Sequence, residues 1–222
     1  MRLSSFVRGT LLCSAVAVLA GCAAPVKYDY TAFRQAKPTS ILVLPPLNDS
    51  PDVNATFSML AQTTYPLAEA GYYVVPVSLM AETFKQNGLS NAPDIHATSP
   101  AKLKEIFGAD AALYIKVKQY GSTYAVLTSA AVVTAEAQLV DLRTGTQLWN
   151  GQATASNDEG NNSGGGLVGL LVTAIVKQIV NNVTDASHGV AGITAVRLLS
   201  PNMHNGILYG PRSPQYGKEP QN

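Results

Sequence analysis

The first half of the chain alternates short apolar runs with segments of helical period. Residues 40–46 form a continuous apolar run that ends at two prolines, which predicts a strand buried on both faces. Residues 55–70 predict a helix capped by Asn54, with a kink or break at Pro66. Its expected inner stripe comprises Phe57, Leu60, Ala61, Thr64 and Ala68. Residues 72–77 predict a second strand, and the β-α-β order favours parallel pairing of the two strands.

Two further helices are expected before the sheet continues. Ser78 can cap a helix that ends near Asn87, and Gly88 follows it. Residues 89–98 then form a loop. Ser99 can cap a short helix that ends at a glycine in position 108, with a proline at its first position.

From residue 110 the period changes to two. Residues 110–120, 124–141 and 146–155 predict three strands, and the glycine at the end of segment 142–145 predicts a tight hairpin between the last two. Residues 185–199 return to helical spacing. We therefore expect an α/β fold: one domain whose mixed sheet joins the N-terminal β-α-β unit to an antiparallel meander, flanked by helices.

The segment Leu167–Val183 has the length of a helix and is apolar almost all round. Such a helix needs a buried environment. Three interpretations remain open: a core helix packed on the sheet, which is favoured, an interface between copies or partners, and insertion into a membrane. The apolar segment is too short to span a bilayer.

The N-terminus has the three-part pattern of a secretory signal peptide: Arg2 and Arg8, an apolar run, and small residues. It ends in Leu19-Ala20-Gly21-Cys22, which resembles the lipobox of bacterial lipoproteins. That resemblance implies cleavage between Gly21 and Cys22 and acylation of Cys22. We therefore expect a signal peptide over residues 1–21, a lipidated tether over 22–39, the folded domain over 40–200 and a flexible tail over 201–222.

Charge and cysteine content narrow the function further. Cleavage removes two arginines, which leaves 13 basic residues against 14 acidic ones. A near-neutral protein without a basic cluster is a poor candidate for binding nucleic acid. Besides Cys22, the only cysteine is Cys13 in the signal peptide, so an internal disulfide is excluded after cleavage.

No motif for catalysis or cofactor binding stands out. The G-x-G-x-x-G at residues 164–169 follows a polar loop, whereas a dinucleotide site has that motif directly after a strand. His96, His188 and His204 lack the spacing of metal ligands, and no G-x-S-x-G elbow is present. We expect no catalytic residue, no cofactor and no metal.

Four blocks together resemble a known family. They are residues 41–46, 66–73, 106–115 and 139–145, the last reading Leu-Val-Asp-Leu-Arg-Thr-Gly. The chain resembles the bacterial lipoprotein family called domain of unknown function 799 and, more distantly, the curli-export lipoprotein CsgG. The resemblance implies an α/β periplasmic domain held at the outer membrane, with no catalytic residues. The chain has no spare pair of alternating segments for membrane-crossing hairpins like those of CsgG.

The sequence thus favours a lipid-anchored outer-membrane lipoprotein that faces the periplasm. Its expected role is that of a non-enzymatic scaffold or assembly partner in an envelope or export complex. Its expected partners are the membrane, reached through the acyl chains on Cys22, and further copies of the chain or other envelope proteins. The alternative is a periplasmic domain that binds a ligand or acts on the cell wall.

Overall fold

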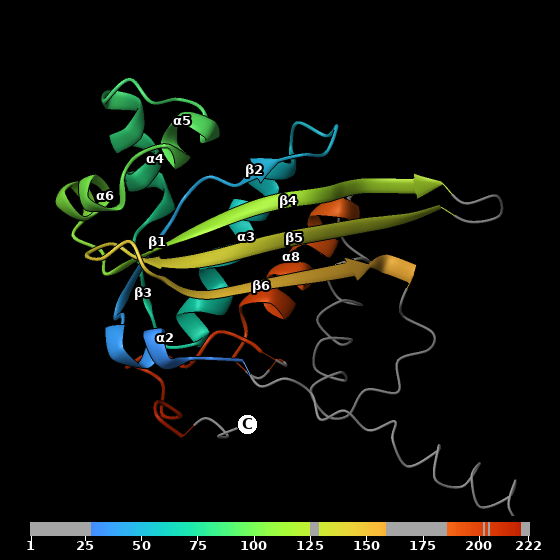
Figure 1. The fold of residues 1–222 in the computed structure, drawn as a ribbon. Helices are drawn as coiled ribbons and strands as arrows, with labels where there is room; N and C mark the ends of the chain where they lie inside the picture. Colours follow the sequence, from blue (N-terminus) through green and yellow to red (C-terminus); the bar gives the residue numbers. More distant parts are fainter. Residues whose placement is uncertain (1–27, 125–128, 159–185, 202, 204, 219–222) are drawn as a thin grey trace, which may run out of the picture.

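A computed structural model describes residues 28–124, 129–158, 186–201, 203 and 205–218. It contains a six-stranded mixed sheet in the order β3-β1-β4-β5-β6, with β2 paired to β4 (Figure 1). Helices flank the sheet, so the expected α/β class and single mixed sheet are confirmed. The lipobox, the segment 167–183, the G-x-G-x-x-G and His204 lie outside the described residues.

The parallel part of the sheet is built from short strands. β1 (Ser40–Val43) pairs in parallel with both β3 (Tyr73–Val74) and β4 (Ala111–Tyr124). The expected parallel β-α-β unit is therefore confirmed, with α3 (Ala55–Glu69) as its helix. β2 (Leu47–Asn48) adds a short parallel pair along β4, in a segment whose composition predicts only a loop.

The meander follows the predicted order. β4 pairs antiparallel with β5 (Ser129–Asp141), and β5 pairs antiparallel with β6 (Gln147–Ser156). In the turn before β6, Asp141 accepts hydrogen bonds from the backbone N–H groups of Arg143 and Thr144, and Gly145 has a φ of 72°. A non-glycine residue would be strained at that φ, so the glycine of the predicted hairpin is explained.

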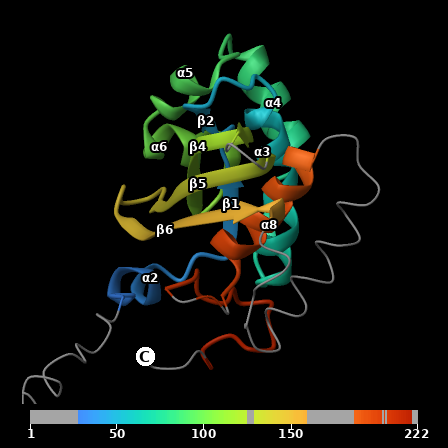
Figure 2. The ribbon, with the colours of Figure 1, turned by 90° about the vertical axis from the view of Figure 1, so that its right-hand side faces the viewer.

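Two helices cover one face of the sheet. α3 and α8 (Ala186–Leu199) lie side by side against β1, β4, β5 and β6, as the two views in Figures 1 and 2 show. The core between them is formed by fully buried residues that include Leu113, Ile115, Val133, Ala135, Leu139, Met59 and Leu67. The alternate residues of the long strands are less buried, which gives the meander its expected wetter face.

Three helices connect β3 to β4. They are α4 (Val77–Gln86), α5 (Ala92–His96) and α6 (Pro100–Phe107). The Ser99 side chain caps α6 as predicted. The prediction of a loop over residues 89–98 is wrong, because the Asn91 side chain accepts a hydrogen bond from the Asp94 N–H and starts α5. A five-residue helix is too short to show a period in the sequence.

The predicted inner stripe of α3 is wrong in most of its members. Leu60 is buried as expected, but Phe57, Ala61, Thr64 and Ala68 are exposed. The buried face is instead Ala55, Ser58, Met59, Leu60, Thr63, Pro66 and Leu67. Of the predicted kink or break at Pro66, the break does not occur, because the helix continues to Glu69. Asn54 precedes the helix but its side chain makes no capping hydrogen bond.

The boundaries expected for the tether and the tail do not match the structure. Residues 31–36 form α2 (Thr31–Ala36), whose Phe33 is 3% exposed and belongs to the core. At the other end Ile207 and Leu208 are buried. The Tyr30 hydroxyl donates to the Gly206 carbonyl oxygen at 2.6 Å, so the two segments are joined directly. The folded domain therefore extends beyond residues 40–200 in both directions.

Close backbone contact explains why the C-terminal segment is held. The Gly210 N–H donates to the Ala70 carbonyl and the Arg212 N–H donates to the Gly71 carbonyl. An ideal Cβ on Gly210 would lie 2.6 Å from the Gly71 backbone, and one on Gly71 would lie 2.4 Å from the Ser213 nitrogen. Side chains at these two positions would block the approach.

Among the described residues, no helix is both long enough and apolar enough to cross a bilayer.

Candidate functional site

The outer face of α3 is an exposed surface without charge. Phe57 is 73% exposed, Tyr65 is 62% exposed, and Val53 just before the helix is 81% exposed. Ala61, Thr64 and Ala68 complete this surface, and the first charged residue of the helix is Glu69 at its end. We call Val53, Phe57, Ala61, Thr64, Tyr65 and Ala68 the outer stripe. Exposed surfaces that combine aromatic residues with a lack of charge are typical of protein interfaces.

A polar cluster fixes which face of α3 points outward. The Ser58 Oγ accepts a hydrogen bond from the Tyr120 hydroxyl at 2.9 Å and lies 2.8 Å from His188 Nδ1. The Gln62 amide nitrogen lies 2.8 Å from His188 Nε2. These contacts join α3 to both α8 and β4. Rotation of α3 would leave these largely buried polar groups unpaired, at a cost of ~1–3 kcal/mol for each group.

The pairing of Ser58 with His188 also resembles a nucleophile with its base. Both ring nitrogens of His188 are engaged, Nε2 with the Gln62 side-chain amide and Nδ1 with Ser58 Oγ, which also accepts from the Tyr120 hydroxyl. Ser58 is 8% exposed and lies in the contact between α3 and α8, so the arrangement fits a structural role.

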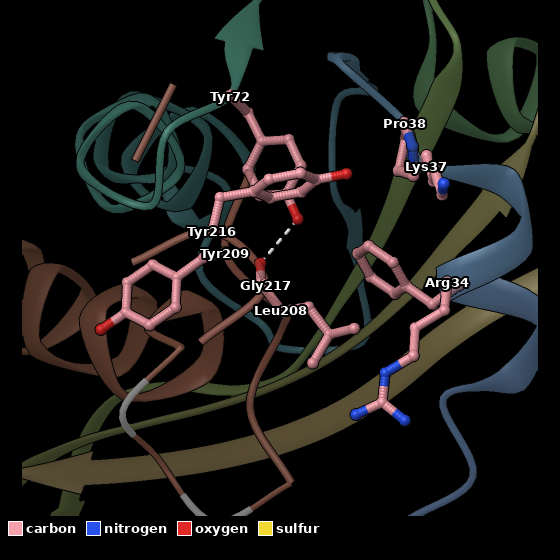
Figure 3. Close-up of a pocket in the computed structure, with 9 residues that line it drawn as sticks. Arg34, Lys37, Pro38, Tyr72, Leu208, Tyr209, Tyr216 and Gly217 are labelled. Atoms are coloured by element: carbon pink, nitrogen blue, oxygen red, sulfur yellow. Dashed lines mark hydrogen bonds between the residues drawn. The ribbon is translucent and has the colours of Figure 1, made fainter. Parts of the chain in front are cut away.

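A cavity of about 390 Å³ lies between α2 and the C-terminal segment (Figure 3). Arg34, Lys37 and Pro38 lie on one side of it, and Tyr72, Leu208 and the tyrosines at 209 and 216 lie on the other. Phe33 also lines it. The Tyr72 hydroxyl donates to the Leu208 carbonyl oxygen at 2.6 Å, which fixes that wall.

A second hollow, of about 610 Å³, lies beside the start of α3. His96 borders it and donates from Nε2 to the Pro45 carbonyl at 2.8 Å. Burial lowers the pKa of His96 more than this hydrogen bond raises it, so the ring is neutral at pH 7. Asp49 contacts Lys118 at 2.9 Å and Lys116 at 3.4 Å. The single carboxylate of Asp49 is thus engaged by two lysines, and the described lining of the hollow shows no arrangement for acid–base chemistry.

Asp110 is the carboxyl with the strongest shift of its pKa. Burial acts to raise this pKa, but hydrogen bonds from Thr39, Lys104 and Ser40 outweigh burial and hold it well below its usual range. The carboxylate thereby ties β1 and the preceding residues to the start of β4. Its partners all belong to the fold, so its role is structural.

Neither the outer stripe nor the cavity could be predicted from the sequence, and each has its own reason. The outer stripe is apolar, and an apolar helix face is normally assigned to the core. The cavity requires segments at residues 33–38 and 208–217, which the sequence places in a tether and a tail. Of the three histidines in the sequence, His96 and His188 lie in different parts of the fold. Within the described ranges no group of three or more potential metal ligands occurs.

Comparison with known proteins extends over nearly the whole chain. Residues 28–212 match a family described as "Putative lipoprotein GNA1162-like". A protein of Neisseria meningitidis serogroup B, described as "Putative lipoprotein NMB1124/NMB1162", is 54% identical over 206 residues, which cover 91% of this chain and 95% of that protein. The crystal structure of lipoprotein GNA1162 from Neisseria meningitidis matches at 57% identity with a TM-score of 0.54, covering 65% of this chain and all of that one.

A more distant match is the PelC dodecamer from Paraburkholderia phytofirmans. It is 14% identical, covers 81% of this chain and 94% of that one, and has a TM-score of 0.42. At that distance nothing about assembly is transferred to this chain.

The resemblance to domain of unknown function 799 and to CsgG is wrong, since the matching family is a different one. The blocks that suggested it include β1 and the turn before β6. Their residues fit a buried parallel strand and a tight hairpin, which are local structures that occur in many folds. The match over residues 28–212 and the 54% identical relative show that the chain belongs to the family of GNA1162-like lipoproteins.

Proposed function

We propose that this lipoprotein is a non-enzymatic scaffold that is anchored in the outer membrane through acylated Cys22 and faces the periplasm. In this role it assembles with further copies of itself within an envelope or export complex. The observation that carries the proposal is the outer stripe of α3, an exposed and uncharged surface on a helix whose other face is held by the core.

The absence of charge on the outer stripe favours a second copy as the partner. Two copies related by a twofold axis bring the same surface together, so any charge on it would oppose its own copy. The stripe has no such charge, and it presents Phe57 and Tyr65 at a spacing of eight residues, about two helical turns. Aromatic side chains of this kind supply much of the binding energy in interfaces.

Anchoring makes a modest interface sufficient. Three acyl chains at ~0.8 kcal/mol for each buried methylene hold a protein stably at a membrane. Copies confined to one surface meet at a raised effective concentration.

A replacement of Cys22 by alanine is expected to abolish lipid labelling and leave the precursor unprocessed.

Cysteine crosslinking in the native envelope tests self-association. The processed chain has no cysteine besides Cys22, so Ala61→Cys and Ala81→Cys each introduce one free thiol, on the outer stripe and on α4 respectively. With a short bifunctional maleimide, Ala61→Cys should give a product of twice the monomer mass, and Ala81→Cys should not. A product only with another protein, or equal dimer formation at both positions, would contradict the proposal.

A further inference from the structure

We propose that the cavity between α2 and the C-terminal segment binds a phosphate ester, with its phosphate at Arg34 and Lys37 and its organic part against the tyrosines. The proposal is independent of self-association, because the cavity and the outer stripe are formed by different residues. Its two parts are a cationic side and an aromatic wall (Figure 3).

The cationic side carries no ion pair in the described part of the chain, and the Arg34 guanidinium contacts only the Tyr30 ring, with its carbon 5.9 Å from the ring centre. Among the described residues that line the cavity, two are cationic and none is a carboxylate. Neither Arg34 nor Lys37 is within ion-pair distance of a carboxylate in the described part of the chain. Asp29 lies outside the lining and acts on Arg34 only through its electric field. Arg34 and Lys37 lie at separate points on the same side of the cavity (Figure 3), and a guanidinium and an ammonium each bind phosphate oxygens well.

The aromatic wall is rigid. Tyr72 is 3% exposed and its hydroxyl donates to the Leu208 carbonyl, so its ring is fixed within the wall, and Tyr216, which is 43% exposed, offers the larger accessible ring. The close approach of Gly210 to Gly71 holds the C-terminal segment in place beside it. Ligand pockets combine such preformed apolar walls with a few polar groups that fix orientation. The volume of about 390 Å³ admits one small molecule.

Two sources share this chemistry: a soluble sugar phosphate and the headgroup of an anionic phospholipid. The lipid source depends on the proposed acylation of Cys22. Thr31 begins α2 nine residues after Cys22, and an extended chain of that length spans at most ~30 Å. The cavity would then lie close to the headgroup layer.

The test uses the processed, full-length protein in nanodiscs of phosphatidylcholine. Calorimetric titration with glucose 1-phosphate should show binding, with inorganic phosphate weaker and glucose inactive. For the lipid source, adding phosphatidylglycerol to the nanodiscs should instead raise the midpoint of thermal unfolding. A response in one arm alone identifies the source.

Variants decide whether the response comes from the cavity. Arg34→Gln together with Lys37→Gln should weaken the binding about tenfold or more, because each hydrogen bond to a charged group contributes substantially. Lys85→Gln with Lys102→Gln removes the same charge from exposed sites on α4 and α6 and should change nothing. Tyr216→Ala should weaken the sugar phosphate but not inorganic phosphate. No response in either arm, or equal responses of the two double variants, would overturn the proposal.

Discussion

α3 and α4 are both surface helices, and they differ in what their outer faces carry. α4 buries Met80 and Phe84 and exposes Glu82, Lys85 and Gln86. α3 buries a similar apolar face, but it exposes the uncharged outer stripe. A charged outer face is what a helix needs for contact with water alone. The exposed side of α3 therefore has the composition of a surface that another protein covers.

The same difference decided how well each helix could be predicted. The charged residues of α4 mark its outer face, and its observed end at Gln86 lies one residue before the predicted one. The predicted cap at Ser78 is wrong, because the helix already begins at Val77. No charge marks the outer face of α3 before Glu69, so Phe57 and Ala61 were assigned to the core. The rotation of α3 about its axis is fixed by contacts of Ser58 with Tyr120 and His188. These partners lie 62 and 130 residues away from Ser58 in the sequence. Sequence periodicity contains no information about such distant partners.

Substitutions on the buried faces of α3 and α4 should have similar effects on the free energy of unfolding, and these effects should be the largest of those predicted. Met59 on α3 and Met80 on α4 are both fully buried. Met59→Ala and Met80→Ala should each lower the free energy of unfolding by ~2–5 kcal/mol, because each leaves a cavity in the core. Urea denaturation measures both. A loss at Met59 below ~1 kcal/mol would show that α3 is not seated on its methionine face.

A substitution at Asp110 should lower the stability of the domain without changing α3 or α4. Asp110→Asn should lower the free energy of unfolding by ~1–3 kcal/mol at pH 7, since charge-assisted hydrogen bonds from Thr39, Ser40 and Lys104 are weakened. The folded-state pKa lies below the unfolded value of about 3.9. The stabilisation is therefore present above about pH 4 and is lost as the pH falls below it.

Denaturation of the wild type and Asp110→Asn across pH 2–7 checks this sign. The two curves should converge at acidic pH. Association of copies should be unchanged at pH 7, which separates a loss of stability from a loss of interface. A difference that grows towards low pH would contradict the assignment.

A charge in the middle of the outer stripe should act on association alone. Ala61→Glu should weaken self-association about tenfold or more, which corresponds to ~1.4 kcal/mol, because two copies would bring like charges together. The free energy of unfolding should change by less than ~0.5 kcal/mol. Energy transfer between labelled copies in nanodiscs measures the first quantity. Ala81→Glu on α4 is the matched control, and an equal effect there would remove the distinction between the helices.

The smallest effect is expected on the outer face of α4. Glu82 and Lys85 form an exposed pair whose charged atoms lie 4.0 Å apart. Such pairs contribute little, so Glu82→Gln should change the free energy of unfolding by less than ~0.5 kcal/mol and leave association unchanged. Denaturation and the same energy-transfer assay would reveal any hidden role for this face.

The ends of the domain could not be predicted, for a different reason from α3. Residues 28–36 mix charged and aromatic side chains without a persistent period, and residues 205–212 contain proline and glycine, which favours a tether and a tail. They are held instead by contacts with groups far away in the sequence: Phe33 and Ile207 are buried in the core, and the Trp149 Nε1 donates to the Asn205 carbonyl at 2.8 Å. By contrast the meander could be predicted, because its alternation and its turn glycine are local signals.

The hydrogen bonds between the N-terminal segment, β6 and the C-terminal segment have a mechanical consequence. Tyr28 bonds to Asn150 on β6 through two hydrogen bonds, and Tyr30 bonds to Gly206. A pull on the N-terminal end of the described chain therefore reaches an edge strand and the opposite terminus at once, before it reaches β1. Tension arriving from a membrane would therefore act first on the hydrogen bonds of Tyr28 and Tyr30, before it acts on the core.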